Sequence, residues 1–231
     1  MTSSTVIRVE GLSFAWSESA PLVLDVNELA IGRGERIFVE GPSGSGKTTL
    51  LSLLGAVVIP RSGTVTVLDR NLADLSHAAR DRFRADHIGF IFQMFNLIPY
   101  LSMVDNVLLP CHFSSRRREA LSRNAHDMRD EAVRLLSRLG LSDDDSNRSV
   151  TELSVGQQQR VAASRALIGG PEIVIADEPT SSLDTDARRA FLELLFEECR
   201  RAESTLVFVS HDRSLGELFD RRIPLREINR A

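Results

Sequence analysis

The decisive stretch of the sequence is Gly41-Pro42-Ser43-Gly44-Ser45-Gly46-Lys47-Thr48, which matches the glycine-rich phosphate-binding loop pattern residue for residue. A β-rich run, Arg36 to Glu40, precedes it, and a helical run, Lys47 to Leu54, follows it. This flanking strand and helix disfavour the alternative of a glycine-rich turn with a coincidental lysine. Kinases, GTPases and ATPases share the pattern, so it predicts a bound nucleotide but does not decide the reaction.

Each residue type in this loop has a physical role toward phosphate. Glycines let backbone amides turn toward one point, where they and the helix N-terminus meet phosphate oxygens. Lys47 can reach the β- and γ-phosphates, and the Thr48 hydroxyl can be a ligand of Mg²⁺. The candidate nucleotide-binding residues of the loop are therefore Gly41, Ser43, Gly44, Ser45, Gly46, Lys47, Thr48 and Thr49.

Two adjacent acids, Asp177 and Glu178, follow directly on the apolar run Ile173 to Ala176. Side chains alternate faces along a strand, but at its end the chain can bend and bring both acids to one site. In an ATPase with such a loop, the first acid holds Mg²⁺, directly or through water, and the second orients and deprotonates the attacking water. The alternative is that the acids cap the turn before Pro179. The upstream phosphate loop favours the catalytic interpretation.

The composition is that of an ordinary globular protein. Of 231 residues, 42% are hydrophobic and 26% are charged, which is enough to bury a sizeable core. The formal net charge of −4 argues against binding nucleic acid through overall charge. The two cysteines have no metal-ligand spacing and predict a reducing compartment. The short arginine groups are interpreted as solvated helix faces or loops; they lie at 80–84, 116–118 and 221–222.

No segment of the sequence predicts insertion into a membrane. The first ten residues lack a basic-then-apolar signal pattern, and the apolar stretch Leu50 to Ile59 is too short to span a bilayer. Any membrane contact is therefore expected to come through a partner. After Asp220 only Arg221 to Ala231 remain, enough for one short strand, so regulation through an appended tail is not expected.

Strand-like and helix-like runs alternate at both ends of the chain. Further β-rich runs lie at Val6 to Val9, Thr64 to Leu68, Ile88 to Phe92 and Leu206 to Ser210. Further helical runs lie at Gln157 to Leu167 and Asp186 to Arg201. Such alternation predicts an α/β fold with a mostly parallel sheet covered by helices. The middle, from about Met103 to Leu139, is helical and charged and is interpreted as an inserted lobe, followed by a polar loop at Ser142 to Ser149.

The run Leu153-Ser154-Val155-Gly156-Gln157-Gln158-Gln159-Arg160 resembles the signature sequence of ATP-binding cassette (ABC) proteins, with Val155 where the commonest form has glycine. Ser154 and the amide of Gly156 lie just before a predicted helix, so they can form a second phosphate-binding helix N-terminus. The departure falls on neither the serine nor the second glycine. Function is therefore expected to survive, although Val155 reduces backbone freedom.

Further positions match ABC motifs in the family's order. Gln93 resembles the Q-loop glutamine, which implies that it senses Mg²⁺ and the attacking water. Ser182-Leu183-Asp184 resembles the loop that crosses between subunits, and His211 resembles the switch histidine that contacts the γ-phosphate. Trp16 falls where the family places an aromatic ring that stacks on adenine. Phe14 is its rival for that role, and a core position for Trp16 stays open.

The resemblance implies a P-loop NTPase (RecA-like) core with N-terminal antiparallel strands and an inserted helical subdomain. The core would comprise 1–93 and about 157–231, and the helical lobe about 94–156, with the signature at its end. The implied catalytic residues are Glu178, His211 and Gln93. The implied nucleotide contacts outside the loop are Trp16, Ser154, Gly156, Gln157 and Asp184, and the implied Mg²⁺ ligands are Thr48, Gln93 and Asp177. ATP would be sandwiched between two copies in a head-to-tail homodimer with two sites.

Within the family, the runs 87–93, 95–99 and 105–107 resemble the branch of macrolide exporters and lipoprotein-releasing transporters. This resemblance implies a separate integral-membrane permease as partner and allows a periplasmic adaptor. It places the chain at the cytoplasmic face of the inner (cell) membrane, as a peripheral protein that contacts the membrane only through the permease and binds no nucleic acid. The segment Phe95 to Val107 is the candidate for binding a cytoplasmic helix of the permease. The transported substrate is not implied.

Other interpretations differ in what the ATPase drives. Cassette ATPases that act on DNA or ribosomes carry coiled coils, zinc modules or a second cassette, and none of these is in the sequence. An ATP-dependent mechanical regulator that signals through a permease-like partner stays open, because cargo never touches the motor. An inactive scaffold is disfavoured by the presence of Lys47, Asp177, Glu178 and His211.

Overall fold

The computed structural model describes residues 5–123, 127–142, 148–181 and 183–231. The chain divides into two compact units, one made of Met1–Arg84 with Thr205–Ala231 and the other of Ala85–Ser204. The division falls inside helix α2 (His77–His87). Each unit contains parallel strands and helices, so the predicted α/β class is confirmed. The predicted domain limits near 93 and 157 remain a prediction.

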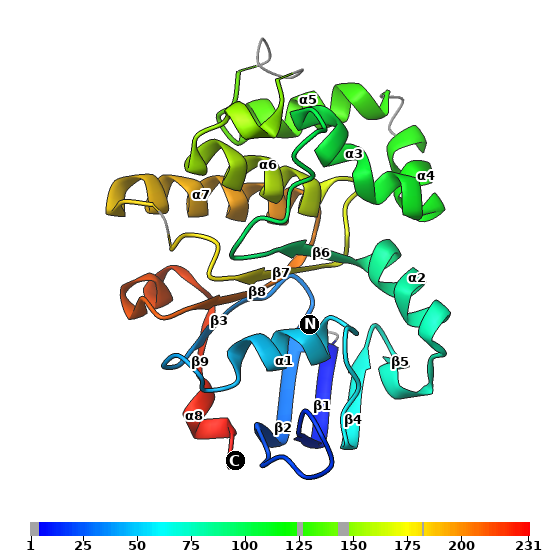
Figure 1. Cartoon of the computed structure of the whole chain (residues 1–231), viewed down its shortest axis with the longest axis vertical. Coiled ribbons are helices and arrows are strands. Elements are labelled where there is room, and N and C mark those ends of the chain that lie inside the picture. The colour runs from blue at the N-terminus through cyan, green and yellow to red at the C-terminus, as the bar shows by residue number, and fades with distance from the viewer. Residues whose placement is uncertain (1–4, 124–126, 143–147, 182) are drawn as a thin grey trace. The chain divides into compact units, whose positions relative to one another are not determined.

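The first unit contains an antiparallel sheet, as the resemblance implied. Its strand order is β2-β1-β4-β5, with bounds Leu24–Gly32, Thr5–Phe14, Ser62–Val67 and Arg70–Asn71 (Figure 1). In β1, Ile7, Val9 and Leu12 are buried, with exposed residues between them, because side chains of a strand alternate between its faces. The sequence did not predict β2, because Asn27 and Glu28 interrupt its apolar pattern.

The same unit contains three parallel strands. β3 (Arg36–Glu40) lies between β8 (Thr205–Ser210) and β9 (Arg221–Pro224) and pairs in parallel with both. Helix α1 (Lys47–Leu54) follows β3, and the short helix α8 (Leu225–Ile228) follows β9. Three rings pack together in this core with centroids 5.1 to 6.2 Å apart, those of Phe38, Phe208 and Phe219.

The second unit combines one parallel strand pair with helices. β6 (Ile88–Ile91) pairs with β7 (Ile173–Asp177). The helices are α3 (Met103–Phe113), α4 (Ser115–Arg123), α5 (Met128–Arg138), α6 (Val155–Leu167) and α7 (Thr185–Arg201). Helix α6 packs against α3, α5 and β6. The described residues between 103 and 138 form α3, α4 and α5, as the helical pattern of this stretch predicted. A Cβ added at Gly89 would lie 2.1 Å from the Ala166 carbonyl oxygen, so only glycine allows β6 to approach α6 this closely.

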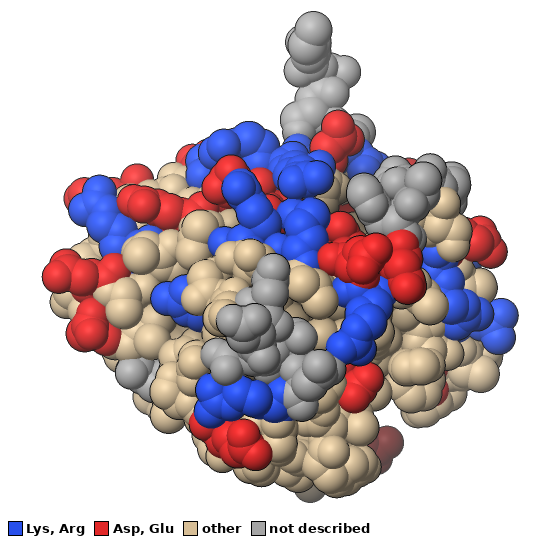
Figure 2. Space-filling view, turned by 90° about the horizontal axis from the view of Figure 1, so that it is seen from above, with Lys and Arg blue, Asp and Glu red and all other residues tan. Residues whose placement is uncertain are grey.

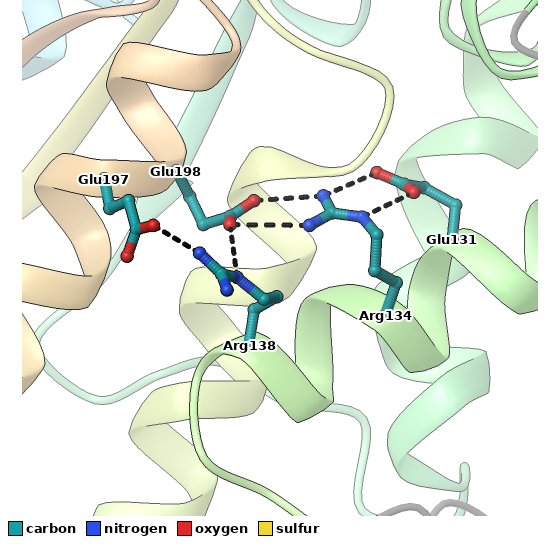
Figure 3. A network of polar contacts seen from close by, with 5 residues as sticks. All are labelled: Glu131, Arg134, Arg138, Glu197 and Glu198. Carbon is teal, nitrogen blue, oxygen red and sulfur yellow. Dashed lines mark hydrogen bonds and ion pairs between the residues drawn. The ribbon is translucent and has the colours of Figure 1, made fainter.

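One buried carboxylate joins α5 to α7 (Figure 3). The Glu198 side chain is 4% exposed, and it accepts hydrogen bonds from Arg134 Nη2 at 3.0 Å and Arg138 Nε at 3.3 Å. Arg134 also donates to Glu131, and Arg138 to Glu197. The Glu131 and Glu198 carboxylates raise the pKa of Arg134 above its ordinary value. Because a buried charge is stable only when it is paired, this network fixes α5 against α7.

Arg117 overturns the interpretation of residues 116–118 as a solvated group. Its side chain is 1% exposed, and its guanidinium donates to the carbonyl oxygens of Ala85, Ile88, Ala166 and Ile168. Burial lowers its pKa to about 10, so the group stays charged at neutral pH. The physical reason for the difference is that these carbonyls, at the ends of β6 and α6, would otherwise be buried without a donor.

Charged side chains of both signs mix on the outer face of the second unit's helices. The face in Figure 2 shows Lys or Arg beside Asp or Glu, with apolar and neutral residues between them. Among the described residues, no helix is both long enough and apolar enough to cross a membrane.

Adjacent glutamates on α7 give a matched test of the buried network. We expect Glu198→Ala to lower the free energy of unfolding by about 3 kcal/mol, because two arginines lose a buried partner. Glu197→Ala, whose side chain is 53% exposed and also pairs with Arg138, should cost less than about 1 kcal/mol. Urea unfolding followed by circular dichroism checks this, and equal losses would contradict it.

Candidate nucleotide site

The loop after β3 has the backbone that a phosphate site requires. Gly44 and Gly46 adopt positive φ values of 78° and 96°, which glycine takes without steric cost. A Cβ at Gly46 would lie 3.0 Å from Leu24 Cδ2 and 3.2 Å from the Val23 carbonyl oxygen. No side chain caps α1, and the first N–H groups of a helix have no acceptor within the helix itself. An anionic oxygen is the acceptor that a helix N-terminus favours.

The side chains of the loop fit the same ligand. Lys47, the only lysine of the chain, is 6% exposed, and its Nζ donates to the carbonyl oxygens of Gly41 at 2.8 Å and Pro42 at 2.9 Å. The Ser45 hydroxyl is buried and has no hydrogen-bond partner among the residues that the structure describes. A buried polar group without a partner is costly. The hydroxyl, the lysine and the uncapped helix therefore fit a bound phosphate group.

The first unit brings His211 to the start of this loop. Glu40 and Ser210 are register partners on the parallel strands β3 and β8, and the next residues are Gly41 and His211. Both loops therefore leave the sheet at the same edge. His211 is exposed there, which is compatible with its predicted contact to a phosphate.

Trp16 and Phe14 differ sharply in exposure. The Trp16 side chain is 62% exposed in the loop after β1, whereas Phe14 is 6% exposed at the strand end. Their ring centroids are 5.1 Å apart in an edge-on arrangement. Since a base can stack only on an accessible ring face, the structure favours Trp16 over Phe14 for the adenine contact.

The second unit brings Gln93 and the two acids to one edge. Ile91 and Ala176 are register partners on β6 and β7, so Phe92 and Asp177 are the next positions of the two segments, and Gln93 and Glu178 follow them. β6 ends at Ile91, one residue earlier than predicted. Glu178 has a positive φ of 44°, which bends the chain directly after Asp177. Such backbone strain in a residue other than glycine is typical of functional sites.

The signature run begins a helix earlier than expected. Helix α6 starts at Val155, not at Gln157, because Ser154 and Gln157 form a capping box. Ser154 Oγ accepts from the Gln157 amide at 3.3 Å, and Gln157 Oε1 accepts from the Ser154 amide at 2.9 Å. Gly156 therefore lies in the first helical turn, and the amides of Val155 and Gly156 are not used by this box. The Gln157 side chain has a structural role here.

The loop before α7 lies beside the signature. A Cβ at Gly156 would be in ordinary contact, 3.5 Å from Leu183 Cδ2. The carboxylate of Asp184 caps α7 by accepting from the Ala187 amide at 2.8 Å. Ser182, the first residue of the predicted crossing loop, lies outside the described residues.

Two arginines that bind backbone carbonyls around β6 carry no motif, and these contacts were not predicted. Arg165 donates to the carbonyl oxygens of Phe95 and Asn96, in the turn after Gln93. For Arg117 the sequence offers one indication: it lies four residues before Leu121, on the same side of the helix, and both side chains are buried on α4. Nothing in the sequence distinguishes Arg165 from the other arginines.

Among the described residues, no group of three or more His, Cys, Asp or Glu side chains is placed to hold a metal ion. Mg²⁺ at nucleotide sites commonly takes one or two protein ligands together with phosphate oxygens. Thr48 and Asp177 are hard oxygen donors of this kind, and the chemistry of the predicted set fits Mg²⁺.

Residues 24–181 match a family model described as ABC transporter. The chain belongs to the ABC transporter family. This ABC protein is 36% identical over 226 residues to the lipoprotein-releasing system ATP-binding protein LolD of Xanthomonas campestris, covering 97% of the chain and 91% of that relative. It is 39% identical over 203 residues to the macrolide export ATP-binding/permease protein MacB of Burkholderia pseudomallei, covering 88% of the chain. It spans only 30% of that relative's length.

Solved structures give the same assignment. The ABC cassette MJ0796, a dimer in a post-hydrolysis state bound to ADP and Pi, has a TM-score of 0.81 and 33% identity and covers 94% of this chain. A second dimeric structure of MJ0796 has the same TM-score and 34% identity. This ABC protein is accordingly an ATPase that binds ATP in a phosphate loop.

The single tryptophan of this ABC ATPase allows a direct test of adenine stacking. We expect Trp16→Ala to raise KM for ATP about tenfold while kcat stays near its normal value, because stacking is lost equally in ground and transition states. Steady-state hydrolysis measures both constants. Phe14→Leu, which changes the buried ring instead, should leave KM near wild type, and the opposite result would assign the adenine contact to Phe14.

Proposed function

We propose that this chain is the ATP-hydrolysing motor subunit of an ABC transporter, working as a head-to-tail homodimer that drives a separate permease. The observation that carries the dimer is the presence of two helix N-termini suited to phosphate. Helix α1 follows the glycine loop, and α6 presents the exposed Ser154 with the first-turn amides of Val155 and Gly156. In the proposed dimer, α1 of one copy and α6 of the other hold the same ATP. The MJ0796 cassette is dimeric in two solved structures, which supports the proposal of a dimer.

In this site, Glu178 takes the proton of the attacking water as general base. Its positive φ turns the backbone directly after Asp177, and the two adjacent acids are given different roles. Gln93, at the same strand edge, orients that water, and His211 donates to the γ-phosphate. Ser154 accepts from the Gln157 amide, which leaves its hydroxyl proton for a phosphate oxygen. Mg²⁺ held by Thr48, Asp177 and phosphate oxygens would neutralise charge on the transferring group.

The permease contact is proposed for the segment Phe95 to Val107. The segment is held by Asn106, which is fully buried. The Asn106 side-chain amide donates to the Ile98 carbonyl, and its side-chain oxygen accepts from the Ile98 backbone amide at 2.8 Å. Around Asn106, Met94 and Tyr100 are 80% and 83% exposed. A rigid segment with exposed apolar side chains is typical of a protein interface. The protein would act at the cytoplasmic face of the inner (cell) membrane, touching it only through the permease.

Glu178→Gln tests the catalytic assignment. We expect hydrolysis to fall at least about a hundredfold because the general base is lost, while ATP binding persists and ATP now accumulates a dimer. Phosphate release and size-exclusion chromatography with light scattering measure the two effects. Glu203→Gln is the matched control, because Glu203 is a second glutamate with positive φ (54°) and lies outside the site. Near-normal turnover of Glu178→Gln would make the assignment wrong.

The dimer itself is tested by adding a second change. Ser154→Arg in the Glu178→Gln background places a bulky side chain at the N-terminus of α6. We expect it to abolish the ATP-dependent dimer, because the opposite copy can no longer approach that helix end. Nucleotide binding by the phosphate loop should remain. Retention of the dimer would contradict the head-to-tail arrangement.

Co-purification with a candidate permease subunit tests the partner surface. We expect Tyr100→Glu to lower the amount of permease recovered in detergent, because a charge replaces an exposed aromatic contact. Phe113→Glu changes an aromatic side chain of similar exposure, 75%, outside the segment and should leave recovery unchanged. Equal loss in both variants, or in neither, would remove this segment as the docking surface.

A further inference from the structure

The turn that follows Gln93 has an unusual backbone. Phe95 and Asn96 have φ values of 59° and 50°, and neither is glycine. Two consecutive residues in the left-handed region are disfavoured for side chains with a Cβ. The turn is tight, because the Phe95 amide donates to the Phe92 carbonyl at 2.9 Å and the Asn96 amide to the Met94 carbonyl at 2.6 Å. Some other contact must stabilise this conformation.

Arg165 supplies that contact from helix α6. One terminal nitrogen of its guanidinium donates to the Asn96 carbonyl at 2.6 Å, and the other donates to the Phe95 carbonyl. The two ends of the fork therefore bind the carbonyls of the two left-handed residues. Within the described ranges Arg165 has no ion pair with an acid, and burial lowers its pKa. Among the described residues, all hydrogen bonds of the Arg165 side chain are to this turn.

The other end of the same strand is also tied to α6. Arg117 donates to the Ile88 carbonyl at the start of β6 and to the Ile168 carbonyl at the end of α6, at 2.8 and 2.7 Å. Strand β6 begins at Ile88, and Gln93 follows two residues after the strand ends. The strand is therefore held to α6 by Arg117 at its start and by Arg165 just after its end. Because Gly89 has no side chain, the two elements can approach each other closely.

We propose that Arg165 is a positioning residue that sets the place of Gln93 and ties it to the helix that begins at Ser154. Helix α6 is a continuous 13-residue rod from Val155 to Leu167, so a force on its N-terminus moves Arg165 with it. When Ser154 meets the ATP of the opposite copy, the turn carrying Gln93 is held in the catalytic arrangement of its own copy. This inference rests on the proposed function of Gln93 and Ser154 and adds the link between them.

The test compares Arg165→Met, Arg165→Lys and the control Arg118→Met in the full chain. Arg118 donates to the consecutive carbonyls of Cys111 and His112, the same donor chemistry at the C-terminal end of α3, where there is no site residue. We expect Arg165→Met to lower kcat by about tenfold to a hundredfold, the effect of a misplaced catalytic group, with KM for ATP near wild type. The half-saturating Mg²⁺ concentration should rise. Arg165→Lys should fall between, because a lysine is a point donor that serves one carbonyl, and Arg118→Met should match wild type.

A second change separates positioning from general damage. Adding Asn96→Gly to Arg165→Met should recover much of kcat, because glycine takes the left-handed conformation without support. Wild-type kcat in Arg165→Met or Arg165→Lys overturns the proposal, as does lack of recovery in the double variant. If Arg165→Met does not fold, as judged by thermal unfolding, Arg165→Lys decides the result. Absence of Mg²⁺-dependent hydrolysis in the wild type would instead reject the proposed function.

Discussion

In both units, two parallel strands end at matching register positions, so the loops that leave them start side by side. Glu40 and Ser210 are partners in one unit, and Ile91 and Ala176 in the other. Evenly spaced hydrogen bonds of a parallel pair fix this register along the whole strand. The residues that follow each end, a phosphate loop and a histidine in one case and a glutamine and two acids in the other, are therefore brought together by the strand register. The buried strands therefore fix the positions of the predicted site residues.

Among the described residues, several arginines donate to backbone carbonyls in addition to those that pair with acids. Arg84, Arg117 and Arg165 each donate to the carbonyl of a distant segment. A guanidinium has five N–H donors in a rigid fork, so a single side chain can satisfy several carbonyls where strands and helices end. Buried carbonyls need donors, and loops between elements cannot supply them to one another. The second unit uses this device at both ends of β6.

Much of this architecture is visible in the sequence because it is local. The phosphate loop, helix α1 and strand β3 have the bounds expected from their residue pattern, and the acids follow a buried strand as expected. Strand β2 and helix α2 were not predicted, since each is too polar to show a strong period. The burial of Arg117 and the contacts of Arg165 could not be predicted, because both depend on carbonyls that only the tertiary fold brings near. The start of α6 at Val155 could have been predicted only if Ser154 and Gln157 had been identified as a capping pair.

Lys47 is the only lysine. The residue is 6% exposed, and its ammonium group donates to the carbonyls of Gly41 and Pro42. Every other basic side chain apart from histidine is an arginine, which amine-directed chemistry does not modify. The folded chain thus has a single side-chain amine, and it lies inside the catalytic loop. Acetylation or any other acylation of a lysine in this protein would therefore act on Lys47 and remove the charge that is proposed to meet the nucleotide. For the same reason its surface charge barely changes in mildly alkaline solution, where lysine-rich proteins begin to lose protons.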